Sequence, residues 1–216
     1  MIKKLHLGCG ERYLKGYINI DFPPAFHSVQ KRSVADRLID IKNLKYPPQS
    51  IEEVRLHHVF EHFPRAVSSA LLATWYTWLK NGGLLRIEVP DLEKMAQTIT
   101  GRFSSKRKKL VAERHIFGSQ EAPWATHFAG YTPLGLTDFL ERYGFKVEKV
   151  KKNNWKGTSN IEVVAIKSDL DITTQGFEKI TRNYLRQFLL DSSESEQRLL
   201  NVWMKVYQSQ VKKNLK

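Results

Sequence analysis

Two glycines and an aspartate near the start of the chain have the types and spacing of a ligand-binding turn. Residues 3–10 read Lys-Lys-Leu-His-Leu-Gly8-Cys9-Gly10, and a second apolar run ends at Asp21. Each run predicts a short strand, with a glycine turn between them. Glycine permits positive φ and lacks a Cβ, so a ligand can lie against the backbone N–H groups of such a turn. Because a carboxylate after the second strand can accept hydrogen bonds from both ribose hydroxyls, these residues predict a nucleoside site.

The spacing argues against a dinucleotide as that ligand. The dinucleotide fingerprint is Gly-x-Gly-x-x-Gly, with an acidic residue about 20 positions further on. Here the third glycine position is Tyr13, and only 10 residues lie between Gly10 and Asp21. A pyrophosphate cradle is therefore the weaker interpretation.

Residues 58–62, His-Val-Phe-Glu-His, also spell His-x-x-Glu-His. On one helix this motif would present two imidazoles to zinc, with a glutamate as base. Here it straddles a predicted strand-to-helix junction, and a protease of that kind needs a further ligand on a following helix. We therefore expect no metal site, and residues that simply begin a helix are the preferred interpretation.

Apolar periodicity and turn residues predict an α/β fold. Strands are expected over residues 17–21, 35–41, 51–59, 84–89, 145–150 and 161–166 after the opening strand, and helices over 65–79 and 132–143. Alternation of strands with helices predicts a parallel sheet with helices on both faces. The crevice of such a sheet lies beyond the carboxyl ends of its strands, where Gly8, Gly10, Asp21, Asp40 and His57 all fall.

The motifs resemble those of class I S-adenosylmethionine-dependent methyltransferases, of the small-molecule and glycan type. Leu-x-Leu-Gly-Cys-Gly followed closely by Asn-Ile-Asp is similar to their first two motifs in an abridged form. Further similar segments are Asn-Gly-Gly-Leu-Leu-Arg-Ile-Glu-Val-Pro-Asp and Leu-x-x-x-Leu-x-x-x-Gly-Phe. The resemblance covers about residues 3–167, and it implies a Rossmann-like, mostly parallel seven-stranded sheet.

The resemblance also implies S-adenosyl-L-methionine as cofactor and S-adenosyl-L-homocysteine as product. Asp40 and the backbone of Ile41 match the position that faces the adenine, and His57 matches the end of the fourth strand, beside the methionine moiety. The complete set of expected cofactor-binding residues is Gly8, Cys9, Gly10, Asp21, Asp40, Ile41 and His57.

The acceptor side is expected in the irregular segment 101–132, where such enzymes differ most. Methyl transfer is an in-line displacement that depends on positioning donor and acceptor. A hydroxyl acceptor also needs its proton removed by an imidazole or carboxylate. By location, the candidates are His127 first, then His58, His115 and Asp91; the choice between O- and N-methylation stays open.

The net charge of +13 is unevenly distributed, since residues 101–156 carry 12 basic and 5 acidic side chains. A basic field of this kind concentrates anionic partners. We expect a small or glycan-type, anionic acceptor. One alternative is an RNA methyltransferase in which Lys106–Lys109 and Lys149–Lys156 follow phosphates and Trp124, Tyr131 or Trp155 stacks on bases. Another is a non-catalytic binding protein that keeps the fold.

The chain is expected to divide into a methyltransferase domain over residues 1–168 and a helical extension over 169–216. Two apolar stripes, Tyr184–Leu185–Phe188–Leu189 and Leu199–Trp203–Val206–Tyr207, predict helices that pack on the domain or form a homodimer. Residues 193–196 resemble a capping box. With one cysteine, no transmembrane run and no signal peptide, a cytoplasmic protein is expected.

Overall fold

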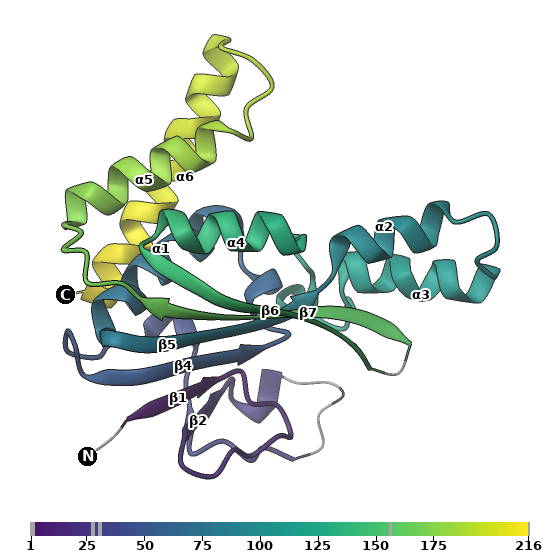
Figure 1. Cartoon of the computed structure of the whole chain (residues 1–216), viewed down its shortest axis with the longest axis horizontal. Coiled ribbons are helices and arrows are strands. Elements are labelled where there is room, and N and C mark those ends of the chain that lie inside the picture. Colours follow the sequence, from purple (N-terminus) through teal and green to yellow (C-terminus); the bar gives the residue numbers. More distant parts are fainter. Residues whose placement is uncertain (1–2, 27–28, 30–31, 156, 216) are drawn as a thin grey trace.

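The computed structural model describes residues 3–26, 29, 32–155 and 157–215. Its centre is a seven-stranded sheet with the strand order β3-β2-β1-β4-β5-β7-β6 (Figure 1). The strands are β1 (Lys4–Leu7), β2 (Ile18–Asp21), β3 (Arg37–Leu38), β4 (Ile51–His57), β5 (Leu79–Pro90), β6 (Phe145–Trp155) and β7 (Thr158–Lys167). All pairs from β3 to β5 are parallel, whereas β7 is antiparallel to both β5 and β6. The expected mostly parallel seven-stranded sheet is confirmed.

Within the described ranges, six α-helices and four short 3-10 helices accompany the sheet. The α-helices are α1 (Arg65–Trp78), α2 (Leu92–Thr100), α3 (Lys106–Phe117), α4 (Pro133–Arg142), α5 (Thr174–Arg186) and α6 (Glu194–Leu215). The 3-10 helices are η1 (Pro24–Phe26), η2 (Ile41–Asn43), η3 (Phe60–His62) and η4 (Pro123–Ala125). None of the helices in the described ranges has the length and apolar character that crossing a membrane requires.

Helices α1, α4, α5 and α6 gather over the same side of the sheet (Figure 1). They cover alternate strand residues, because successive side chains of a strand point to opposite faces. The covered apolar residues are Leu5, Leu7, Val54, Leu56, Leu85, Ile87, Val163 and Ala165. Across the helical layer, the rings of Phe139 in α4 and Tyr184 in α5 stack with centroids 4.1 Å apart.

The alternate residues of the central strands are polar. Glu53 pairs with Lys4 at 3.8 Å and with Arg86 at 2.8 Å, and Arg55 pairs with Glu162 at 3.6 Å. Helices were expected on both faces of the sheet. Helices α1, α4, α5 and α6 all cover one face, and these ion pairs lie on the opposite face.

The third strand is much shorter than predicted. Only Arg37 and Leu38 pair with β2, whereas a strand was expected over residues 35–41. Asp40 instead begins η2, with its Oδ1 accepting the N–H of Lys42 at 2.9 Å. An aspartate side chain favours such a cap over a continued ladder.

The C-terminal helix α6 packs on α1 and on η2 of the same chain. Its buried residues are Leu200, Met204, Tyr207, Gln210, Val211 and Asn214. The predicted stripe was wrong at Leu199 and Val206, which are exposed. The predicted start of the last helix is confirmed, since α6 begins at Glu194. The capping-box hydrogen bond is not formed, because Glu196 accepts the N–H of Leu190 and the N–H of Ser193 donates to Asp191. A homodimer through these helices stays a prediction.

Gly8 and Gly10 both have positive φ, at +67° and +56°, but only Gly8 is crowded. A Cβ on Gly8 would lie 2.2 Å from a methyl of Val59, whereas a Cβ on Gly10 would meet nothing within 4 Å. We expect Gly10→Ala to lower the free energy of unfolding by about 1–2 kcal/mol, from backbone strain alone. Gly8→Ala should cost about 3 kcal/mol or more, because overpacking adds to that strain. Urea unfolding of both variants measures the difference, and equal losses would contradict it.

The buried end of α6 gives a second stability test. Asn214 donates to the carbonyls of Lys42 at 3.1 Å and Leu44 at 2.8 Å. We expect Asn214→Ala to lower the free energy of unfolding by about 2 kcal/mol, because the Leu44 carbonyl loses its donor and the buried Gln210 amide loses the Asn214 acceptor at 2.6 Å. The exposed Gln208, whose amide donates to Glu178 at 2.8 Å, is the matched control. Its alanine variant should change stability by about 0.5 kcal/mol or less.

Candidate functional site

A large cavity of about 890 Å³ opens at the carboxyl ends of β1, β2 and β4. We refer to it as the large cavity. All seven predicted cofactor-binding residues line it, namely Gly8, Cys9, Gly10, Asp21, Asp40, Ile41 and His57. Asp21 and His57 end β2 and β4, the two glycines and Cys9 form the turn after β1, and Asp40 and Ile41 begin η2. The parallel register brings them to one sheet edge.

The Asp21 carboxylate holds the glycine turn in place. Its Oδ2 accepts the N–H of Gly10 at 2.6 Å, and its Oδ1 accepts the N–H of Phe22 at 2.7 Å. The N–H groups of Gly8 and Cys9 both donate to the carbonyl of Ile20, at 2.8 and 3.1 Å. The turn is therefore preorganised, with a carboxylate at its centre.

His57 and His6 form a neutral imidazole pair on the cavity wall. Burial, and next the guanidinium of Arg55, lowers the pKa of His57 to about 3. Burial also lowers the pKa of His6, whose Nδ1 lies 3.0 Å from the amide oxygen of Asn19. At neutral pH both rings are uncharged, so they present polar but neutral edges to a ligand.

Aromatic residues of the irregular segment close the cavity from the other side. Trp124 in η4 stacks on Phe22 with ring centroids 6.4 Å apart, and Phe128 also lines the cavity. The acceptor-side segment predicted over 101–132 thus contributes to the wall of the large cavity. The same segment also contains α3 and the loop that follows α3.

Several residues of the large cavity were missed from the sequence, including Arg12, Lys42, His62 and Phe63. Arg12 and Lys42 bring positive charge to the wall. No motif singles them out, because turn lysines and arginines are usually solvent-exposed. Only the folded structure identifies Arg12 and Lys42 as residues that line the cavity.

Among the four candidate catalytic residues, His58 alone lines the large cavity as the structure describes it. It has a φ of +53°, an uncommon conformation for a residue other than glycine. Its Nδ1 lies 3.4 Å from Glu61, and its Nε2 lies 3.5 Å from Glu88. Burial lowers the pKa of His58, but the two carboxylates outweigh burial and raise the pKa to about 9.

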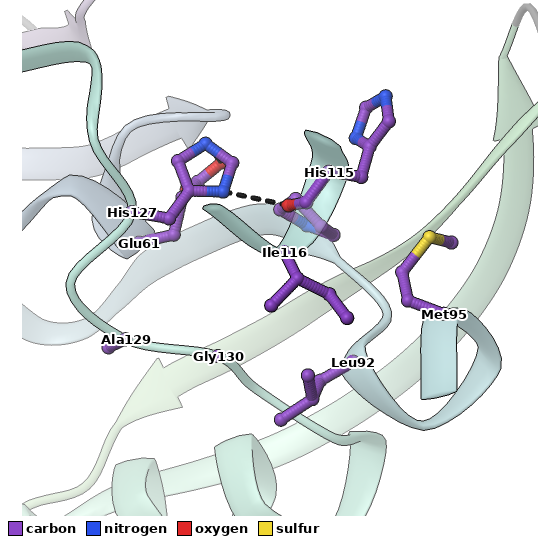
Figure 2. Close-up of a pocket in the computed structure, with 9 residues that line it drawn as sticks. Glu61, Leu92, Met95, His115, Ile116, His127, Ala129 and Gly130 are labelled. Carbon is purple, nitrogen blue, oxygen red and sulfur yellow. Dashed lines mark hydrogen bonds and ion pairs between the residues drawn. The ribbon is translucent and has the colours of Figure 1, made fainter. Parts of the chain in front are cut away.

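His127 lines a second, small cavity of about 10 Å³ (Figure 2). Its ring lies next to that of His62. The two rings make an edge contact with centroids 4.6 Å apart. His127 Nε2 lies 3.9 Å from Glu61, which is fully buried. Burial raises the pKa of Glu61, but His58, His62 and His127 outweigh burial and hold the pKa below its usual value.

The other two candidates occupy different places. His115 lines the small cavity, and Figure 2 shows its ring extending away from the Glu61 carboxylate. Asp91 lines neither cavity; its Oδ1 accepts the N–H of Lys94 at 3.1 Å and begins α2. The structure gives Asp91 a helix-capping function.

No protein-family model matches the sequence, and no curated protein matches it. Solved structures do match. A chain of a complex that contains the Haloferax volcanii Trm112 methyltransferase activator is 13% identical, with a TM-score of 0.54; the match covers 78% of this chain and 83% of that one. A Methanosarcina mazei S-adenosylmethionine-dependent methyltransferase is 14% identical, with a TM-score of 0.51 and coverage of 77% and 92%.

A third match is the Burkholderia thailandensis 1,6-didemethyltoxoflavin-N1-methyltransferase, solved with that compound and S-adenosylhomocysteine. It is 14% identical with a TM-score of 0.50, and the match covers 77% of this chain and 71% of that one. At such identities these likenesses establish the fold alone. The fold is the Rossmann-like fold of S-adenosylmethionine-dependent methyltransferases.

Cys9 lies in the glycine turn, with 3% of its surface exposed. Burial, and next the charge of Asp21, raises the pKa of its thiol to about 12. Only the thiolate reacts, so at pH 8 we expect iodoacetamide to label the folded protein about a thousandfold more slowly than the urea-unfolded chain. Mass spectrometry of timed samples measures both rates. Equal rates would show that the turn does not shield the thiol.

Proposed function

We propose that this protein is an S-adenosylmethionine-dependent methyltransferase that acts on a small or glycan-type, anionic acceptor. The observation that carries the proposal is the convergence of all seven predicted cofactor residues on one cavity of about 890 Å³. That volume suits a nucleoside-sized ligand together with part of an acceptor. The fold shared with methyltransferases supports the same assignment.

Each part of the cofactor has a proposed partner. The Asp21 carboxylate, beside the glycine turn, binds the ribose hydroxyls. Asp40 and the backbone of Ile41, at the start of η2, face the adenine. The neutral ring of His57 borders the methionine end, and because it carries no charge it does not repel the positive sulfonium.

The wall of the large cavity supports an anionic acceptor. Arg12 and Lys42 line the cavity, and residues 101–156 carry most of the excess positive charge. Aromatic rings of Trp124 and Phe128 would cover a flat or glycan-type acceptor. A methyltransferase with the same fold acts on the small molecule 1,6-didemethyltoxoflavin, which supports a small acceptor here.

The reaction itself needs little chemistry from the protein. The sulfonium methyl is already activated, so holding donor and acceptor in line supplies a large part of the catalysis. His58 follows His57 at the end of β4 and lines the same cavity. Because its pKa of about 9 keeps the ring protonated at neutral pH, we assign it to binding an anionic acceptor and not to removing a proton. The pair formed with Glu61 and Glu88 fixes the orientation of its ring.

Thermal unfolding tests the cofactor assignment. A ligand that binds only the folded state raises the melting temperature. We expect S-adenosylmethionine and S-adenosylhomocysteine to do so and NAD not to. Asp21→Ala should abolish the effect. Gly10→Ala should weaken it, because Gly10 lines the cavity and an added methyl group there would hinder a ligand from approaching the turn backbone.

The exposed Asp171 provides the matched control, since Asp171→Ala removes a carboxylate far along the chain from the glycine turn. Circular dichroism establishes that each variant is folded. If folded wild-type protein shows no shift with either nucleoside, the proposed function is wrong. If Asp21→Ala responds like wild type, the ribose assignment is wrong.

A further inference from the structure

We propose that Glu61, His62 and His127 bind a divalent transition-metal ion, for which Zn²⁺ is the probe. One ligand atom of each residue lies within 4.8 Å of those of the other two. Two imidazole nitrogens and one carboxylate oxygen suit Zn²⁺ and leave a fourth position open. No metal was expected from the sequence, because residues 58–62 straddle a predicted strand-to-helix junction and no further ligand was recognised on a following helix. The third ligand, His127, is 65 positions beyond His62 and in no recognisable motif.

The Glu61 carboxylate is the first observation that points to a cation. Its side chain is buried, and neither oxygen forms a hydrogen bond of good geometry with any group that the structure describes. Its ion-pair partner His58 is shared with Glu88, so one imidazole faces two carboxylates. The nearest nitrogens are Nδ1 of His58 at 3.4 Å and Nε2 of His127 at 3.9 Å. A buried carboxylate needs pairing or a metal to offset its loss of hydration.

The orientation of the two imidazoles is a second, independent observation. His62 Nδ1 lies 3.2 Å from the carbonyl of Thr126, and His127 Nδ1 lies 2.8 Å from the carbonyl of His115. A carbonyl only accepts, so each Nδ1 carries the proton and each Nε2 keeps its lone pair. Metal-binding histidines are typically held in one tautomer by a hydrogen bond of this kind.

Backbone hydrogen bonds hold the two ligand-bearing segments together. The N–H groups of Phe128 and Ala129 donate to the carbonyl of Glu61, at 2.9 and 3.2 Å. The N–H of His127 donates to the carbonyl of Phe117 at 3.2 Å. Bond lengths to Zn²⁺ of about 2.0–2.2 Å imply ligand separations of about 3.3 Å, so only side-chain adjustments are needed.

A second cluster, formed by His57, Glu88 and Glu162, is a weaker candidate for a metal site. There the Arg55 guanidinium already bonds His57 Nε2 at 3.0 Å and pairs with Glu162 at 3.6 Å. A fixed positive charge occupies the place of a cation, so we assign no metal to that cluster.

The proposed site lies in the wall between the two cavities. His62 lines the large cavity, whereas Glu61 and His127 line the small one. A divalent ion lowers the pKa of a bound water or hydroxyl group. It could therefore activate a hydroxyl acceptor beside the methyl donor. That role rests on the proposed function, but metal binding does not.

Zinc titration of the folded, tag-free protein tests the site. After dialysis against a chelator and then against buffer, we expect isothermal titration calorimetry to show one Zn²⁺ per chain, and Mg²⁺ to bind far more weakly. Glu61→Gln, His62→Ala and His127→Ala should each weaken Zn²⁺ binding by at least about tenfold. His115→Ala is the matched control, because that imidazole lines the same small cavity but lies outside the triad.

Each outcome decides the proposal. The proposal is supported if His115→Ala keeps its affinity for Zn²⁺ and the three ligand variants lose theirs. Circular dichroism must show that all four variants are folded. Absence of Zn²⁺ uptake by wild type, or an equal loss in His115→Ala, overturns the proposal. Because the titration contains no S-adenosylmethionine, its failure would leave the proposed methyl transfer untouched, and failure of nucleoside binding would leave the metal site untouched.

Discussion

The hydrogen bond from the N–H of Gly10 to the Asp21 carboxylate joins the ends of β1 and β2, and the large cavity is built around it. Both glycines of the turn need positive φ, and Gly8 also needs the space that a Cβ would take from Val59. With the turn fixed, the backbone and one carboxylate face the same space. A longer connection with a helix would place the second strand's end differently relative to the turn.

The sheet is covered unequally, and the C-terminal helices contribute to the covered face. The first three strands follow one another without an α-helix in the described ranges. Helix α6 lies against α1 and η2, where Gln210 and Asn214 bond the Lys42 carbonyl. It thereby satisfies polar backbone that a short 3-10 helix leaves open. The extension is thus part of the core of the same chain.

The segment from His57 to His62 connects the two cavities. Within six residues, the chain supplies a neutral imidazole, an imidazole paired with two carboxylates, a buried carboxylate and a further imidazole. The positive φ of His58 turns the chain sharply between the strand and η3, so the side chains of His57 and His62 both reach the large cavity. Residues 126–129 include His127, whose ring lies next to that of His62 and near the Glu61 carboxylate.

The sequence by itself determined the glycine turn, most of the strands and the positions of Asp21 and His57, because these depend on local periodicity and on the rule that parallel strands end at one edge. It did not determine the short third strand, the exposed side of α6 or the use of Asp91 as a cap. In each case, side-chain hydrogen bonding or packing against distant residues decided the outcome. Only the tertiary structure brought His127 to Glu61 and His62, since the backbone bonds that align those segments join residues more than 60 positions apart.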